Sequence, residues 1–135
     1  MVYSVGLYIR LSKEDKDNFL SESVVNQKSL LRQYAIENNL EIFDYYIDDG
    51  YSGTNFDRPE FRRLINDIEN KRINMVITKD MSRLGRDYIE TCNLIEKYFP
   101  LNGVRYIAIT DNIDTYLDNS NNEITPFKAI MNDYY

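Results

Sequence analysis

A hydroxyl and a guanidinium lie two positions apart near the start of the chain, in a short segment that ends at Ser12. The segment closes an apolar stretch, so we expect it to end a strand. Side chains alternate between the two faces of a strand, which puts Tyr8, Arg10 and Ser12 on one face. An arginine inside a strand is unfavourable unless it pairs with an anion. Two interpretations follow: Ser12 is a nucleophile beside an anion-binding arginine, or Arg10 pairs with a carboxylate and Ser12 begins a loop.

A second group of cations lies in the segment from Lys79 to Asp87. Arg83 and Arg86 stand three positions apart, around a glycine and just before an expected helix. Guanidinium groups bind phosphate through planar, bidentate hydrogen bonds. The N-terminus of a helix offers further N–H donors to an anion. The alternative for this segment is a solvated basic loop.

Residue types that are absent limit the chemistry. The 135 residues include no histidine, which excludes a Ser-His-Asp triad. The single cysteine, Cys92, excludes an internal disulfide and a Cys/His zinc site. No glycine-rich phosphate-binding motif is present. Catalysis would therefore use hydroxyls, carboxylates, lysines and arginines, and we expect no cofactor and no metal.

The distribution of charge differs from its sum. The net charge is −6, which argues against a nucleic-acid-binding domain. Between Arg58 and Arg86, however, eight basic residues stand against four acidic ones, so this segment carries +4 and the rest of the chain −10. An acidic body with a basic sector indicates local anion binding, with bulk affinity for DNA supplied elsewhere.

Strands and helices alternate four times and must position these side chains. The hydrophobic pattern predicts strands at Tyr3–Leu11, Glu41–Ile47, Asn74–Thr78 and Val104–Thr110, and helices at Val24–Asn38, 57–72 and Tyr88–Phe99. Ser23 and Asp57 are expected to cap the first two helices. The segment Lys79–Asp87 is expected to be a loop, and Thr125-Pro126 to begin a further helix.

This order of elements predicts an α/β fold, a single domain with a mainly parallel, four- to five-stranded sheet flanked by helices. Ligands of such sheets bind beyond the carboxyl ends of the strands. Ser12, Asp48–Arg58 and Lys79–Arg86 all follow strands, so their polar groups should meet at one edge of the sheet. No apolar run is long enough to span a membrane and no signal peptide is recognisable, which predicts a cytoplasmic protein with no membrane partner.

Taken together, the motifs resemble the catalytic domain of serine site-specific recombinases, the resolvase/invertase family. They stand in the family's order, at similar spacing, at Tyr8–Ser12 (Y-x-R-x-S), Asn26-Gln27, Gly50–Phe61 (G-x-S-G…R-P-x-F) and Ser82–Asp87 (S-R-L-G-R-D). The resemblance covers almost the whole chain. The form of the third motif is most similar to the large serine recombinases, which include transposon-borne recombinases and phage-type integrases.

The resemblance implies a reaction in which Ser12 attacks a DNA backbone phosphorus and forms a 5′-phosphoserine, leaving a free 3′-hydroxyl. Arg10, Arg83 and Arg86 would surround the phosphate and stabilise the charge of the transition state. The other residues implied at the site are Arg58 and Lys79 as further phosphate-binding cations, Gln27 as a supporting polar group and Tyr8 as a brace. The covalent link conserves the energy of the phosphodiester, so rejoining needs neither ATP nor metal.

Two features depart from the family pattern. Ser82 stands where many small resolvases have aspartate, so no assisting carboxylate is carried over to it. The family's long C-terminal helix barely begins at Phe127–Tyr135. Residues 1–135 are therefore expected to be a catalytic domain truncated at the start of that helix, monomeric and inactive alone. The resemblance implies double-stranded DNA as a partner, dimers and tetramers of the full-length protein, and downstream DNA-binding domains.

Two other functions are open from the sequence. One is a catalytically silent assembly or DNA-binding domain of a larger mobile-element protein, against which the presence of Ser12 and the arginines argues. The other is a receiver-like phosphotransfer module with Mg²⁺ held by Asp48 and Asp49. It predicts an acidic cluster after the first strand, where this chain has Arg10 and Ser12. A turn before Gly50 is the plainer interpretation of the two aspartates.

Overall fold

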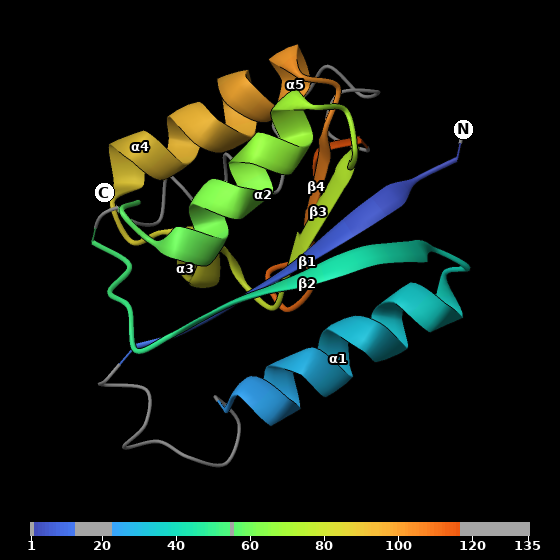
Figure 1. Ribbon diagram of the computed structural model, residues 1–135, viewed down its shortest axis with the longest axis horizontal. Coiled ribbons are helices and arrows are strands. Elements are labelled where there is room, and N and C mark those ends of the chain that lie inside the picture. The colour runs from blue at the N-terminus through green and yellow to red at the C-terminus, as the bar shows by residue number, and fades with distance from the viewer. Residues whose placement is uncertain (1, 13–22, 55, 117–135) are drawn as a thin grey trace.

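The computed structural model of the chain describes residues 2–12, 23–54 and 56–116 (Figure 1). In chain order its elements are β1 (Ser4–Leu11), α1 (Val24–Glu37), β2 (Glu41–Asp49), α2 (Pro59–Glu69), β3 (Met75–Thr78), α3 (Met81–Leu84), α4 (Tyr88–Asn93), the π-helical turn η2 (Leu94–Tyr98), α5 (Phe99–Leu101), β4 (Arg105–Ala108) and β5 (Ile113–Asp114). The helix expected to begin at Thr125-Pro126 lies outside the described residues.

Five strands form one sheet in the order β2-β1-β3-β4-β5. The first four strands along the chain are parallel to one another. The short β5 pairs antiparallel with β4 at one edge. The predicted α/β fold with a mainly parallel sheet is therefore confirmed. Within the described ranges, no helix is long and apolar enough to cross a membrane.

Helices cover both faces of this sheet: α1 lies on one face, and α2 with α4 lies on the other (Figure 1). The central strand β1 is buried because its alternating side chains meet both layers. Leu7 and Ile9 share one core with Leu31 of α1. Tyr8, from the opposite side of the strand, belongs to a second core with Leu64 of α2.

The chain changes its direction of winding at β1. From β1 it passes through α1 to β2 on one side, and then through α2 to β3 on the other side. In α/β sheets, ligands bind at such a switch point, beyond the carboxyl ends of the two central strands. In this chain the residues that follow those ends are Ser12, after β1, and the Lys79–Arg86 segment, after β3.

The predicted cap of α1 is confirmed, whereas the predicted cap of α2 is wrong. The Ser23 hydroxyl accepts a hydrogen bond from the Asn26 amide at 3.0 Å. The residue before α2 is Arg58, which makes no side-chain cap bond, and Asp57 pairs with Arg62 instead. The amides at the start of α2 are capped instead by Asp48, a residue of β2.

The prediction that the segment Lys79–Asp87 is a loop is also partly wrong. Met81–Leu84 forms the single helical turn α3, and the Asp80 carboxylate caps it by accepting the Arg83 amide at 3.3 Å. Four residues are too few for the hydrophobic period to reveal a helix. Arg10 and Arg58 hold the turn by donating hydrogen bonds to its carbonyl oxygens.

The helix predicted at Tyr88–Phe99 is confirmed and extends to Leu101 as α4, η2 and α5. Pro100 lies within its last turn, not after its end. Proline lacks the amide that an α-helical bond would use, and the π-helical turn just before it is a wider winding that accommodates this irregularity. Asn102 and Gly103 follow the helix directly, with Gly103 at a φ of 68°.

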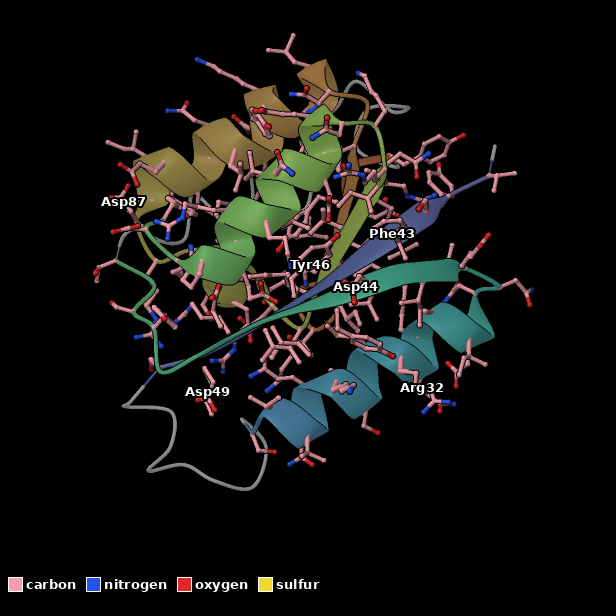
Figure 2. All side chains as sticks on the ribbon, in the orientation of Figure 1. Arg32, Phe43, Asp44, Tyr46, Asp49 and Asp87 are labelled. Carbon is pink, nitrogen blue, oxygen red and sulfur yellow. The ribbon has the colours of Figure 1, made fainter. Side chains whose placement is uncertain are left out.

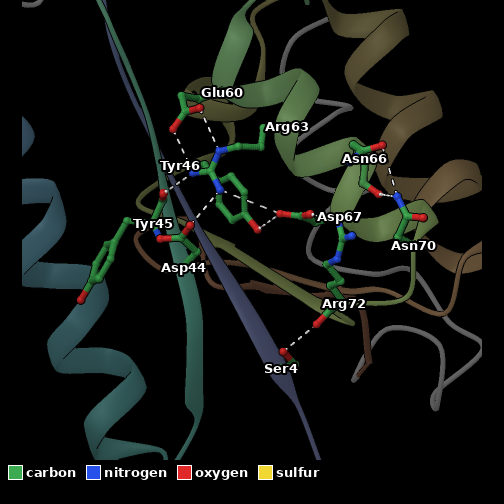
Figure 3. A network of polar contacts seen from close by, with 10 residues as sticks. All are labelled: Ser4, Asp44, Tyr45, Tyr46, Glu60, Arg63, Asn66, Asp67, Asn70 and Arg72. Carbon is green, nitrogen blue, oxygen red and sulfur yellow. Dashed lines mark hydrogen bonds and ion pairs between the residues drawn. The ribbon is translucent and has the colours of Figure 1, made fainter.

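Part of the basic segment is paired with carboxylates of the same domain, in a network between β2 and α2 that Figure 3 shows from close by. Arg63 donates to Asp44 at 2.8 Å and to both carboxylate oxygens of Glu60 at 2.9 Å. Its guanidinium carbon also lies 4.1 Å from the centre of the Tyr46 ring. Bidentate pairing and stacking of this kind fix α2 against the sheet.

The same network continues to Asp67, a buried carboxylate of α2. Asp67 accepts hydrogen bonds from the Tyr46 hydroxyl at 2.6 Å and from Arg72 at 2.8 Å (Figure 3). Arg72, like Arg62 and Arg63, thus pairs with a carboxylate of the same domain. These three arginines are used within the domain, and the cations at the edge of the sheet are the ones placed to bind an anion.

Candidate active site

Ser12 lies directly after β1, beside the α3 turn that follows β3. It is 6% exposed. Two side chains from different elements bond the Arg10 carbonyl, two residues before it: Gln27 Nε2 of α1 at 3.2 Å and Arg83 Nη1 of α3 at 3.3 Å. The backbone that leads to the serine is thereby fixed between a helix on each face of the sheet.

Arg10 is completely buried. Its guanidinium donates to three carbonyl oxygens: Nε to Arg83 at 3.2 Å, Nη2 to Ser82 at 2.6 Å and Nη1 to Tyr51 at 3.1 Å. The partners are backbone oxygens and not a carboxylate, so the alternative in which Arg10 pairs with a carboxylate is wrong. Burial, followed by the neighbouring cations Arg58, Arg86 and Arg83, lowers the pKa of Arg10 to about 10. The residue still carries its charge at neutral pH.

Tyr8 and Asp48 form a second buried layer behind Arg10. The Tyr8 hydroxyl donates to Asp48 Oδ2 at 2.8 Å. Asp48 also accepts the backbone amides of Glu60 and Phe61, each at 3.0 Å. This carboxylate of β2 therefore caps the N-terminus of α2, where amides have no partner within the helix. Burial raises the pKa of Tyr8 above its ordinary value; the Arg58 cation opposes that shift and Asp48 reinforces it, so the hydroxyl remains a donor.

Arg58 completes this layer and has no exposed surface. Its Nη1 donates to the Tyr8 hydroxyl at 2.7 Å, and its Nη2 donates to the Leu84 carbonyl at 2.7 Å. Arg58 thus bonds Tyr8 and the end of α3, which differs from the direct phosphate contact expected for it.

The loop after β2 lies against the guanidinium of Arg10. Gly53 packs so closely that a Cβ there would stand 2.8 Å from Arg10 Nη2 and 2.9 Å from Arg86 Cγ. The Gly53 carbonyl accepts the Arg86 amide at 2.7 Å. Only glycine allows this approach of the backbone. Arg86 itself is exposed at the carboxyl edge of the sheet, and Lys79, also after β3, is partly exposed.

Ser82 and Asp80 form a further pair on α3. The Ser82 hydroxyl donates to Asp80 Oδ1 at 2.5 Å. A carboxylate thus stands beside the position where the resemblance suggested that one was lost. Sequence reasoning gave Asp80 no role, and it considered Asp48 only as a turn residue or a magnesium ligand. Asp80 has a usable signal, since aspartate is a common N-cap before a short helical turn, whereas the role of Asp48 depends on a contact that no local pattern predicts.

The magnesium site of a receiver-like module is wrong for this chain. Asp48 is 1% exposed, and its oxygens accept three hydrogen bonds within the protein. Asp49 is exposed at the end of β2 (Figure 2), and neighbouring residues of a strand point to opposite faces. The two carboxylates therefore do not converge on one ion.

Comparison with known proteins agrees with the motifs. The family described as the resolvase N-terminal domain matches residues 5–135, and the chain therefore belongs to this family, which comprises catalytic domains of serine site-specific recombinases. The crystal structure of the N-terminal catalytic domain of TP901-1 integrase is similar, with a TM-score of 0.79 and 31% sequence identity over 97% of this chain and 92% of that one.

Two other relatives extend the comparison. A resolvase family site-specific recombinase from Streptococcus pneumoniae has a TM-score of 0.74 and 26% identity, over 98% of this chain and 85% of that one. The uncharacterized immunity region protein 3 of Bacillus phage phi105 is 32% identical over 68 residues, which are 49% of this chain and 79% of that protein. The likeness thus includes an integrase and a protein of a phage.

Proposed function

We propose that this chain is the catalytic domain of a DNA strand transferase in which Ser12 is the nucleophile. The observation that carries the proposal is the position of Ser12 at the switch point of the sheet, with Arg83 bonded to the Arg10 carbonyl just before it, the Arg10 guanidinium bonded to α3, and Arg86 at the same edge. In the reaction, Ser12 Oγ forms a bond to a backbone phosphorus as the P–O3′ bond breaks. The products are a 5′-phosphoserine and a free 3′-hydroxyl.

The charges around Ser12 suit the transition state of this step. A pentacoordinate phosphorane carries more negative charge on its oxygens than the diester, and fixed guanidinium groups stabilise that difference. We assign this work to Arg10, Arg83 and Arg86, with Lys79 as a further phosphate contact. Gln27 and Tyr8 hold the backbone and side chains of the site. The reverse attack by a 3′-hydroxyl restores a phosphodiester, so neither ATP nor a metal ion is required.

The partner we propose is double-stranded DNA, bound by dimers and tetramers of the full-length protein. The domain has a net charge of −6, and the arginines of α2, Arg62 and Arg63, pair with carboxylates of the same domain, so DNA affinity has to come largely from elsewhere. We propose that DNA-binding domains following a long C-terminal helix supply it, and that residues 1–135 alone form the catalytic part.

The test uses the protein with its DNA-binding part, incubated without added metal with supercoiled DNA carrying its recombination sites and quenched in denaturant. Mass spectrometry should find a nucleotide adduct on the peptide that contains Ser12, and Ser12→Ala should abolish both adduct and cleavage. Cleavage that persists in Ser12→Ala, or an adduct on another residue, would remove Ser12 as the nucleophile. Specific binding without cleavage would favour the catalytically silent assembly domain.

A further inference from the structure

Arg58 is a charged side chain in a fully enclosed place. It has no exposed surface, and three aromatic rings surround its guanidinium: the ring centres of Phe56 and Phe61 lie 4.9 Å from the guanidinium carbon, and that of Tyr8 lies 5.5 Å from it. Aromatic faces attract a cation and so offset part of its loss of water. The rings stabilise Arg58 where it stands and occupy the space around its guanidinium.

Two hydrogen bonds of Arg58 are directed to the end of α3. Its Nη2 donates to the Leu84 carbonyl at 2.7 Å, and its Nη1 lies 3.4 Å from the Arg83 carbonyl. The last carbonyls of any helix lack partners within it, and a single turn has almost none that are satisfied. Arg58 supplies these partners from behind the site, as Arg10 does for the Ser82 and Arg83 carbonyls.

The residues that Arg58 holds are those that carry the site. Arg83 is the residue of α3 that bonds the Arg10 carbonyl near Ser12, and Arg86 follows two residues after Leu84. We propose that Arg58 is a positioning residue, which fixes α3 so that Arg83 and Arg86 face Ser12 and which does not itself contact the DNA phosphate. This inference rests on the proposed function, because it assigns Arg58 a place in the same phosphoryl transfer.

The planar fork of arginine explains why this residue type is needed. Arg58 reaches the Tyr8 hydroxyl and two carbonyls at once while its flat face lies among the rings. A lysine ammonium has the charge but lacks both the fork and the flat face. Arg58→Lys is therefore expected to recover only a small part of what Arg58→Gln loses.

The first test measures DNA binding as a function of salt for the protein with its DNA-binding part. Each lost phosphate contact lowers the slope of log affinity against log salt by about 0.9. Arg58→Gln should leave the slope unchanged, whereas the matched variant Arg86→Gln, at the exposed edge, should lower it. A decrease for Arg58→Gln equal to that for Arg86→Gln would overturn the inference.

The second test measures the single-turnover rate of phosphoserine formation at saturating DNA. Arg58→Gln should slow it by about tenfold or more through misplacement of α3, and by much less in an Arg83→Gln background, because the two residues act on one path. An equal fold-loss in both backgrounds would show that Arg58 does not act through Arg83.

The Arg58 Nε–H resonance of the wild-type protein gives a further check that needs no variant. It should not shift when duplex DNA is added, and a large shift would contradict the inference.

These outcomes are separable from failure of the proposed function. If the wild-type protein forms no phosphoserine, the nucleophile assignment fails. The salt slope and the Arg58 resonance still report whether Arg58 meets a phosphate, because both depend on binding and not on chemistry.

Discussion

At the scale of single residues, the buried cations of the site donate hydrogen bonds to backbone oxygens of the protein itself. Arg10 donates to carbonyls of α3 and of the loop after β2, and Arg58 donates to α3 and Tyr8. Side chains locked in this way keep their orientation without reorganising when charge develops, which is how preorganised donors stabilise a transition state.

Gly53 is the residue at which a single methyl group should disturb this arrangement. In Gly53→Ala, the Cβ would overlap Arg10 Nη2 and Arg86 Cγ, so the loop or the guanidinium must move. We expect a loss of about 1–3 kcal/mol in the free energy of unfolding, as for other overpacked sites, and a slower phosphoserine formation. Urea denaturation and single-turnover cleavage measure the two effects. Thr54→Ala, at an exposed neighbouring position, is the control; equal results for both variants would show that the loop accommodates a Cβ.

Two substitutions can separate the two roles of Asp80, as the cap of α3 and as the partner of Ser82. Asparagine caps a helix about as well as aspartate, whereas alanine does not. Asp80→Ala should therefore destabilise the protein by about 1 kcal/mol, and Asp80→Asn by only a few tenths. If Asp80→Asn nevertheless slows cleavage while its unfolding curve stays close to that of the wild type, the carboxylate serves the reaction through Ser82. Equal destabilisation by both variants would mean that the cap contributes little and that charge dominates.

At the scale of elements, Asp48 joins β2 to α2 and to β1. Its carboxylate satisfies two amides at the start of α2 and the Tyr8 hydroxyl. Asp48→Ala would leave these donors buried without an acceptor, close to the Arg58 cation. We expect a loss of about 3 kcal/mol or more in the free energy of unfolding.

The adjacent residue provides the matched control for that prediction. Asp49→Ala removes the same carboxylate from an exposed position one residue further along β2, and surface substitutions of this kind change stability by about 0.5 kcal/mol or less. Thermal or urea unfolding of the two variants separates a structural carboxylate from an exposed one. Similar losses for both would contradict the role assigned to Asp48.

At the scale of the whole molecule, the free energy of unfolding at low pH should depend on the network between β2 and α2. Burial alone would raise the pKa of Asp67, but hydrogen bonds from Tyr46 and Arg72 hold it below its ordinary value. A carboxyl whose pKa is lower in the folded state stabilises the fold above its unfolded value, near 3.9. This contribution is lost as pH falls through the lower, folded value.

Tyr46→Phe should therefore reduce the dependence of stability on pH below about pH 4, because it removes one of the bonds that lower the pKa of Asp67. Free energies of unfolding from urea titrations between pH 6 and 3 measure the slope. Tyr45→Phe, on the opposite side of the same strand, serves as the comparison. An unchanged slope in Tyr46→Phe would mean that Arg72 and Arg63 alone set the protonation of Asp67.

Much of the fold could be predicted because it depends on local pattern. The pattern of apolar residues predicted the four parallel strands and the three main helical segments, and Ser23 marked the start of α1. The same alternation put Tyr8 and Arg10 on one face of β1, and both contact the layer formed by Arg58 and α3. The errors fall where tertiary contacts replace a local rule: the cap of α2, and the turn at Met81–Leu84.

The sequence by itself determined the class of fold and the family, because hydrophobic periodicity and the order of short motifs are both properties of the linear chain. Only the tertiary structure decided what each charge does. Arg62, Arg63 and Arg72 count toward a basic segment in the sequence, yet they pair with carboxylates of the same domain. Arg10 and Arg58 bond backbone oxygens 25 to 73 positions away. The physical reason is that the energy of a charge depends on the solvent and partners around it, which distant parts of the chain supply only after folding.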